Sequence, residues 1–230
     1  MATLLLARHG EKESESGPVN WELRLTPGGV VDIASTAAAL SARGLLPCRI
    51  VSSPFPRCVQ TAALYAAALL PQAQLPPVIA IEPGLCEVLS PAYGGKGLTT
   101  ARPEWTHAAL QAIAEQAAPG VALDAEYAPI VAAHELQLER SDGCRREVAA
   151  RVQRLGAALA AAAAAAEAAG GSGGLTLWVT HGSPCRRLVD VLDPAHAPCE
   201  EPAMGSVLHL VGGRVVARVG PAPRRAPAPR

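Results

Sequence analysis

The stretch Thr3-Leu4-Leu5-Leu6-Ala7-Arg8-His9-Gly10 decides the fold that the sequence predicts. Its first five residues form a short apolar run. A run of this length that stops at a charged, glycine-bearing turn is typical of a buried strand. In α/β proteins the carboxyl ends of such strands carry the functional side chains. We therefore expect a strand over Thr3–Ala7 that delivers Arg8 and His9 to a site.

The same order of strand, polar turn and helix occurs twice more along the chain. Arg49–Ser52 is a second short strand, followed by the Ser53–Pro56 turn and a helix that begins near Arg57. Leu175–Thr180 is a third strand, followed by His181-Gly182 and a further helix. This recurrence predicts an α/β fold, a three-layer sandwich with a mostly parallel central sheet flanked by helices.

Periodicity and turn residues predict the remaining elements. Thr26-Pro27 is typical of a helix start, because threonine caps the first turn and proline is tolerated at the first helical position. Residues 221–230 consist of proline, alanine and arginine, which cannot bury a core, so we expect a disordered tail there and one domain over residues 1–220. The other expected elements are a helix over Thr26–Gly44, a strand over Val78–Ile81, a loop over Ser90–Arg102, helices over Trp105–Ala117 and Asp142–Ala169, and a hairpin of Val207–Leu210 with Val215–Val219.

The composition excludes several classes of function. Lysine plus arginine and aspartate plus glutamate each number 20 in 230 residues, so no bulk charge attracts nucleic acid or an anionic membrane. Aromatic residues are only 3%, too few for base stacking, and no apolar run approaches the roughly 20 residues of a membrane span. The start lacks the basic segment of a secretion signal. We expect a cytoplasmic protein, and nothing in the sequence indicates an oligomeric state.

The cysteines and histidines do not form a metal-binding pattern. Six cysteines are spread through a chain long enough to build its own core, so we expect reduced thiols and no disulfide framework. The sequence has no Cys-x-x-Cys pair and no His-Glu-x-x-His segment, and His196-x-x-Cys199 alone is a weak signal. We therefore expect that the protein needs neither a metal nor another cofactor.

Imidazole and guanidinium groups gather at the three predicted strand ends. Arg8 and His9 follow the first, Arg57 follows the second, and His181 follows the third. Arginine offers planar, bidentate donors to phosphoryl oxygens, and a neutral imidazole can attack phosphorus directly. Phosphoryl transfer needs mainly an aligned nucleophile and positive groups around the oxygens. We expect these four residues to converge around one phosphate.

These motifs resemble the histidine phosphatase superfamily, which has the phosphoglycerate mutase-like fold and the hallmark Arg8-His9-Gly10 after its first strand. The segments that resemble its UBASH3/Sts branch are Ser52-Ser53-Pro54, Arg57-Cys58-Val59-Gln60-Thr61-Ala62, Gly84-Leu85-Cys86-Glu87 and Val179-Thr180-His181-Gly182-Ser183. The resemblance implies that His9 is the phosphorylated nucleophile, and that Glu87 is the general acid. It also implies that the phosphate is bound by Arg8, Arg57, His181 and, where the branch commonly has arginine, Lys12.

Several residue assignments have open alternatives. Glu82, Glu11 and Glu104 compete with Glu87 for the role of proton donor, because a carboxylate in a loop is usually solvated. Cys58 and Cys86 flank the predicted site. As small buried hydrophobic side chains they need no further role, and a regulatory thiol is the alternative.

The expected function is hydrolysis of a phosphomonoester through a phosphohistidine. The substrate would be a phosphotyrosine-like phosphoprotein or a small phosphorylated molecule, selected by Ser90–Arg102 and by Asp124–Asp142. One alternative is a phosphoglycerate mutase-type phosphotransferase, although Glu13–Leu25 matches the mutase pattern poorly. The other is a non-catalytic phosphate-binding module, which would need the positive groups but no proton donor.

Overall fold

The computed structural model describes residues 3–14, 22–70, 77–87, 105–132, 149–159, 161, 174–196 and 199–221. These residues form one seven-stranded sheet in the order β4-β3-β2-β5-β1-β6-β7. The strands are β1 (Thr3–Arg8), β2 (Arg49–Ser52), β3 (Val78–Ile81), β4 (Ala122–Leu123), β5 (Thr176–Thr180), β6 (Val207–Val211) and β7 (Arg214–Val219). The expected mostly parallel α/β sheet is confirmed.

The centre of the sheet is parallel, and one edge is antiparallel. β5 lies between β1 and β2 and runs parallel to both. The carboxyl ends of these three strands therefore lie side by side. β3 and β4 continue the parallel side. β6 and β7 form the expected antiparallel hairpin beside β1. The two-residue strand β4 was not predicted from the sequence, because two residues are too few to show a period.

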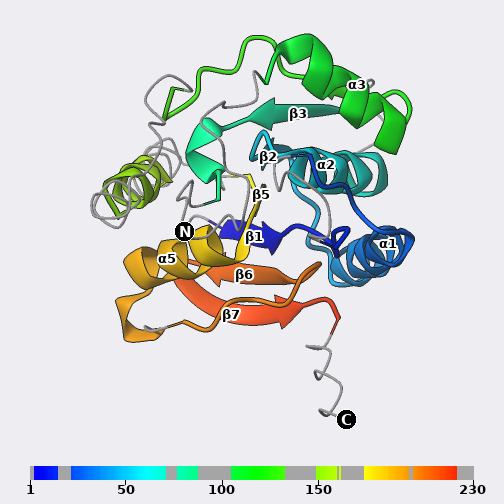
Figure 1. The fold of residues 1–230 in the computed structure, drawn as a ribbon. Helices are drawn as coiled ribbons and strands as arrows, with labels where there is room; N and C mark the ends of the chain where they lie inside the picture. Colours follow the sequence, from blue (N-terminus) through cyan, green and yellow to red (C-terminus); the bar gives the residue numbers. More distant parts are fainter. Residues whose placement is uncertain are drawn as a thin grey trace.

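Helices cover both faces of the sheet (Figure 1). α1 (Pro27–Ala42), α2 (Pro56–Leu69) and α3 (His107–Ala117) lie on one face, whereas α5 (Gly182–Leu192) and the helical residues 149–159 lie on the other. Two 3-10 turns, η1 (Pro83–Leu85) and η3 (Pro194–His196), follow β3 and α5. This arrangement is the predicted three-layer sandwich.

The start of α1 follows from local capping, as predicted. Thr26 Oγ1 accepts a hydrogen bond of 2.9 Å from Gly29 N, and Pro27 takes the first helical position of α1. α2 begins at Pro56, one residue before the predicted Arg57. The predicted loop Ser90–Arg102, the ends of the helix predicted over Asp142–Ala169, and the tail from residue 222 lie outside the described residues.

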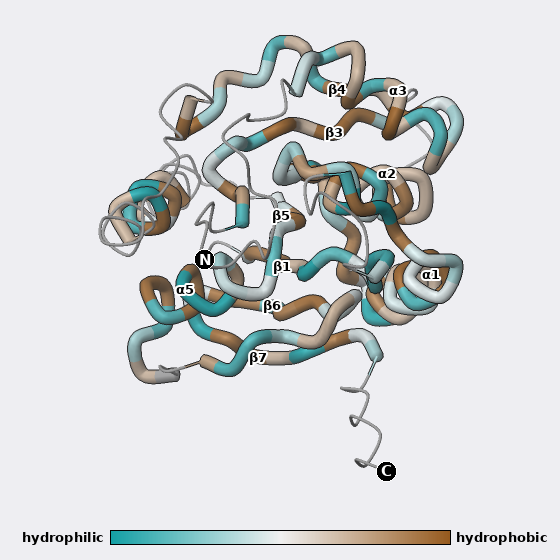
Figure 2. The backbone as a smooth tube through the Cα atoms, viewed as in Figure 1, coloured by the Kyte–Doolittle hydropathy of each residue, from teal (hydrophilic) through white to brown (hydrophobic). Residues whose placement is uncertain are grey.

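The core lies between the sheet and its helices. Apolar colour runs along the central strands in Figure 2, and Leu5 and Leu6 of β1 are fully buried. Along the edge strand β7, exposed residues instead alternate with less exposed ones, and Val216 is 56% exposed. In the part of the chain that the structure describes, no helix combines the length and the apolar character needed to cross a bilayer.

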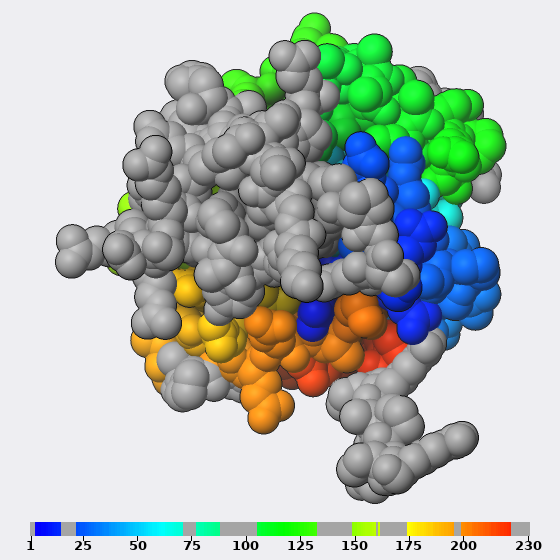
Figure 3. All heavy atoms as spheres, viewed as in Figure 1, coloured from blue at the N-terminus to red at the C-terminus, as the bar shows by residue number. Residues whose placement is uncertain are grey.

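The segment before β6 packs against the end of β1. Arg8 N donates to Ser206 O over 3.0 Å, and Gly205 N donates to His9 O over 2.9 Å. In the space-filling view, atoms of the orange segment near residue 200 lie next to the dark blue start of the chain (Figure 3). Residues far apart in the sequence thus fix the backbone on both sides of Arg8 and His9.

The first turn of α1 also approaches the end of β1 closely. Thr26 N donates to Glu11 O over 3.0 Å. A Cβ added at Gly29 would collide with the backbone of Glu11, and one added at Gly10 would meet Gly29 O at 3.1 Å. Glycine at position 29 is required for the helix and the turn to touch, and a side chain at position 10 would force its neighbours to shift, so the position of α1 is tied to the turn after His9.

We expect Gly29→Ala to lower the free energy of unfolding by about 1–3 kcal/mol, because the backbone of Glu11 must move away from the new methyl group. Denaturation in urea measures this change. Gly28→Ala is the matched control: a Cβ there first meets the end of the flexible Glu11 side chain, at 3.0 Å. A cost at Gly28 as large as that at Gly29 would contradict the close-packing argument.

Candidate active site

Backbone hydrogen bonds align the three strand ends. His9 N donates to Thr180 O over 2.9 Å, and Ser53 N donates to Val179 O over 3.0 Å. Because β5 is the shared neighbour, the residues after β1 and β2 are brought to the two sides of His181. The predicted convergence of polar groups from three strands is therefore present in the structure.

His9 is buried, and the structure fixes its tautomer. Its side chain is hydrogen-bonded through Nδ1 to Gly10 O over 2.7 Å. A carbonyl oxygen can only accept, so Nδ1 carries the proton and Nε2 carries the lone pair. Burial first, and then the charges of Arg57, Arg8 and Lys12, hold the pKa of His9 well below its ordinary value, against the opposing effect of the Gly10 hydrogen bond. The imidazole is neutral at pH 7 and has a free nucleophilic nitrogen.

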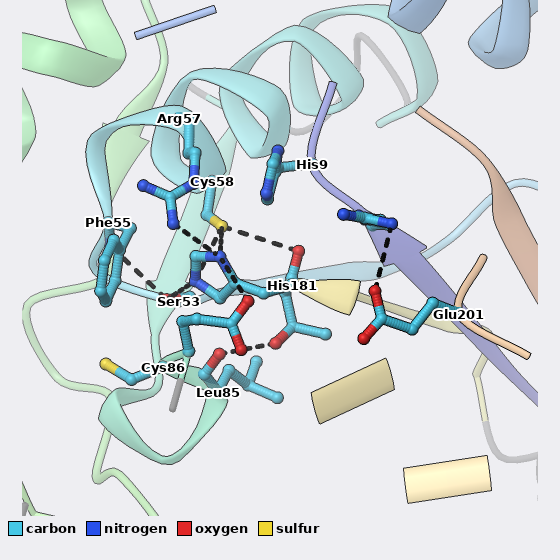
Figure 4. Close-up of polar contacts among 12 residues, drawn as sticks. His9, Ser53, Phe55, Arg57, Cys58, Leu85, Cys86, His181 and Glu201 are labelled. Carbon is cyan, nitrogen blue, oxygen red and sulfur yellow. Dashed lines mark hydrogen bonds and ion pairs between the residues drawn. The ribbon is translucent and has the colours of Figure 1, made fainter. Parts of the chain in front are cut away.

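His181 lies beside His9, and its two nitrogens have different partners. The ring centroids are 5.2 Å apart at an interplanar angle of 69°. Arg57 Nη2 donates to His181 Nδ1 over 3.1 Å, so the proton of the neutral ring is on Nε2, which donates to Ser53 Oγ over 3.1 Å. Figure 4 shows Arg57, Ser53 and Cys58 gathered around this imidazole, with His9 nearby. Burial first, and then the Arg57 charge, lower the pKa of His181 well below its usual range.

Arg57 is held by the start of α2 and by an aromatic ring. Its guanidinium lies 4.6 Å from the centroid of Phe55, which in turn meets His181 edge-on with ring centroids 4.6 Å apart. Only 2% of the Arg57 residue is exposed. Because the guanidinium is buried, water screens its charge little. This charge therefore acts on both histidines.

Arg8 reaches the site from the end of β1. Its Nη1 donates to Pro202 O over 2.8 Å and lies 3.6 Å from Glu201 Oε2. A Cβ added at Gly182 would meet the Arg8 guanidinium carbon at 2.9 Å, which places Arg8 against the first turn of α5. Its positive charge contributes to the lowered pKa of both His9 and His181.

Glu87 lies at the site, on the turn that follows η1. Its Oε2 is 4.0 Å from His181 Nδ1, and 26% of its side chain is exposed. The carboxyl group is thus near the His181 imidazole and partly exposed to solvent. Of the predicted catalytic residues, the structure brings His9, Arg57, His181 and Glu87 together and places Arg8 at the edge of the group.

Two of the alternative acids have structural partners. Glu82 is fully buried, and its oxygens accept four hydrogen bonds of 2.6–3.1 Å, from Gly84 N, Tyr127 Oη, Ile130 N and Val131 N. Glu11 accepts from Thr26 Oγ1 over 2.9 Å at the start of α1. Glu104 lies outside the described residues. Glu82 therefore anchors loops, and the geometry favours Glu87 as the proton donor.

Lys12 and the two neighbouring cysteines complete the surroundings. The backbone of Lys12 forms an isolated antiparallel β-bridge with that of Leu25. The charge of the Lys12 side chain contributes to the lowered pKa of His9. Cys58 and Cys86 are fully buried free thiols. Cys58 Sγ lies 3.4 Å from His181 Nε2, and burial raises the pKa of this thiol far above its ordinary value. Cys58 stays protonated, in keeping with a packing role.

Ser53, Phe55 and Glu201 also contribute to the site, although they were not predicted from the sequence. Ser53 and Phe55 stand in the turn after β2, next to residues that were singled out, so their location was a usable signal. Glu201 contacts Arg8 from far along the chain, and no local pattern marks it. Within the described ranges, no group of three or more histidine, cysteine or acidic side chains could hold a metal ion.

A family comparison agrees with this geometry. The model of the histidine phosphatase superfamily (branch 1) matches residues 4–128, which include β1, β2 and the turn that carries Glu87. The chain belongs to the histidine phosphatase superfamily. No curated protein matches it by sequence. The matched residues include the Arg8-His9-Gly10 turn and Arg57 but end before β5 and His181.

Solved structures of superfamily phosphatases share the fold. The ecdysone phosphate phosphatase of Bombyx mori, in complex with tungstate, has a TM-score of 0.66 at 17% identity, over 100% of this chain and 97% of that one. The protein histidine phosphatase SixA, with tungstate, has 0.56 at 16%, over 95% and 96%. A mycobacterial glucosyl-3-phosphoglycerate phosphatase has 0.54 at 23%, over 92% and 90%. At these identities the likeness shows the phosphoglycerate mutase-like fold alone.

The buried neutral histidines predict how stability changes with pH. Both have a lowered pKa in the folded protein, so below about pH 6.5 the unfolded chain binds more protons than the folded one. We expect a constant free energy of unfolding just above pH 7. Between about pH 6.5 and 5 it should fall by up to about 1.4 kcal/mol per pH unit for each histidine. Urea denaturation at a series of pH values measures the slope.

The variants His9→Gln and His181→Gln separate the two contributions. Each should remove about half of the slope below pH 6.5, since each deletes one group that takes up a proton on unfolding. A slope equal to that of the unmodified protein in both variants would show that other groups cause it.

Proposed function

We propose that the protein hydrolyses phosphomonoesters through a phosphohistidine formed on His9 Nε2. The observation that supports this proposal most is the hydrogen bond that His9 Nδ1–H donates to Gly10 O. It leaves a neutral nucleophilic nitrogen in a cluster of buried positive groups. A neutral imidazole is the form that can attack phosphorus, and the surrounding cations suit a charged phosphoryl group.

The reaction would proceed in two balanced steps. In the first, the Nε2 lone pair attacks phosphorus, the bond from phosphorus to the ester oxygen breaks, and Glu87 gives its proton to that oxygen. In the second, water attacks the phosphohistidine, Glu87 takes up a proton from the water, and inorganic phosphate leaves with His9 restored. Glu87 thus ends in the protonation state in which it began.

The phosphate would be bound by positive and donor groups from every part of the cluster. Arg8, Arg57 and Lys12 supply charge, and His181 supplies the Nε2–H that here points to Ser53 Oγ. Two guanidinium groups can bind phosphoryl oxygens bidentately and stabilise the charge of the transition state. These groups supply the positive charge that a metal supplies in other phosphatases, so we propose metal-independent turnover.

The substrate and the branch are part of the proposal. Residues 57–62, 84–87 and 179–183 resemble the UBASH3/Sts branch, which supports a phosphotyrosine-like or small phosphorylated substrate. We further propose that residues 1–220 form a single domain, because one sheet includes strands from Thr3 to Val219. A mutase would instead return the phosphoryl group to the substrate, and a binding module would not turn over.

We expect His9→Ala to abolish turnover of para-nitrophenyl phosphate while vanadate binding is partly retained, because Arg8, Arg57 and His181 remain. Assays of purified protein in chelator measure turnover, and phosphate trapped by quenching should be acid-labile and absent from His9→Ala. Release of inorganic phosphate from 3-phosphoglycerate, and not conversion to an isomer, separates hydrolase from mutase. Full activity of His9→Ala, or activity lost in chelator, would refute the mechanism.

Glu87→Gln should distinguish leaving groups. We expect turnover of phenyl phosphate to fall by about 10²–10⁴, the usual contribution of a general acid, because phenolate needs a proton to leave. Para-nitrophenyl phosphate should be affected much less, since its leaving group departs as the anion. Glu82→Gln offers the competing acid for comparison. A larger leaving-group contrast in Glu82→Gln than in Glu87→Gln would assign the proton to the other carboxylate.

A further inference from the structure

A further buried arginine lies behind the turn that carries Glu87. Arg151 belongs to the helical residues 149–159 on the α5 face of the sheet, and only 4% of it is exposed. Its Nη2 donates to Cys86 O over 3.1 Å. Burying a guanidinium costs several kcal/mol unless its interactions compensate, so a fold that buries one gains something specific from it.

The carbonyl that Arg151 binds belongs to the residue before Glu87. The same short turn is fixed at two earlier points: Glu82 accepts from Gly84 N over 2.8 Å, and Thr180 Oγ1 donates to Leu85 O over 2.6 Å. Figure 4 shows Leu85 and Cys86 beside His181. The contact at Cys86 is the last of the three before Glu87, and it is made by a charged donor, which binds a carbonyl more strongly than a neutral one.

The charge of Arg151 also reaches the site. It contributes to the lowered pKa of His181, after burial and the charges of Arg57, His9 and Arg8. The helix that carries Arg151 lies on the α5 face of the sheet, whereas α2, which carries Arg57, lies on the other face. The position of Arg151 links the α5 face of the sheet to the catalytic turn.

We propose that Arg151 is a positioning residue for Glu87: it clamps the Cys86 carbonyl and so holds the Glu87 carboxyl group where it can protonate the leaving oxygen. The proposal rests on the proposed function, in which Glu87 is the general acid. Proton transfer requires a donor within hydrogen-bond reach of the leaving oxygen, and a displacement of about 1 Å can cost about 10²-fold in rate.

The test is the ratio of kcat/KM for phenyl phosphate to that for para-nitrophenyl phosphate. This ratio does not depend on the fraction of folded enzyme, so it remains readable if a variant folds poorly. For Arg151→Met we expect phenyl phosphate to lose about 10–10² in kcat/KM and para-nitrophenyl phosphate less than about threefold. Arg151→Lys keeps a charged donor and should recover part of the loss. Arg154 is an exposed arginine of the same helix, so Arg154→Met is the matched control and should leave the ratio unchanged.

The double variant Arg151→Met with Glu87→Gln separates positioning from general support of the fold. If Arg151 acts through Glu87, adding Arg151→Met to Glu87→Gln should change the ratio less than about twofold. Equal losses on both substrates in Arg151→Met, or multiplicative effects on the ratio in the double variant, would overturn the inference. Absence of any leaving-group contrast in Glu87→Gln itself would instead refute the assignment of the acid, and with it the role of Arg151.

Discussion

The site depends on one interaction, the hydrogen bond from the buried Arg57 guanidinium to His181 Nδ1. Arginine can only donate, so this contact fixes the tautomer of His181 and turns its Nε2–H toward Ser53. Burial first, and then the same Arg57 charge, disfavour protonation of both imidazoles and lower the pKa of His9 and of His181. A protonated His9 would have no lone pair for attack on phosphorus, so burial and the Arg57 charge together keep His9 in the form that the proposed mechanism requires.

The parallel sheet provides the alignment on which this contact depends. β5 pairs with β1 on one side and β2 on the other, and the three strands end at the same level. Arg57 enters from the first turn of α2, where Phe55 supports its guanidinium. The electrostatic cost of burying several charged and polar groups is offset by the apolar core under them, in which Leu5, Leu6 and Ile50 are fully buried.

Much of this arrangement was predictable because its signals are local. The Thr3–Ala7 run, the Thr26-Pro27 cap and the polar turns after two further strands each occupy a few consecutive residues, and the structure confirms them. Features set by packing between distant segments were not predictable. The resemblance favours Glu87 over Glu82 as the acid, but no local pattern separates the two carboxylates. Their difference comes from donors elsewhere in the chain, such as the Ile130 and Val131 amides, which make Glu82 an anchor. The contact of Glu201 with Arg8 depends on how the chain returns to β6, for which no short segment carries a code.

The way in which Glu82 binds its loop has a consequence for substitutions there. Three of its four donors are backbone amides, from Gly84, Ile130 and Val131, and every amino acid except proline supplies such a donor. Apart from the Tyr127 hydroxyl, the carboxylate therefore recognises the path of the chain and not its side chains. Substitutions at Ile130 or Val131, proline excepted, would therefore keep the backbone donors that attach this loop to Glu82.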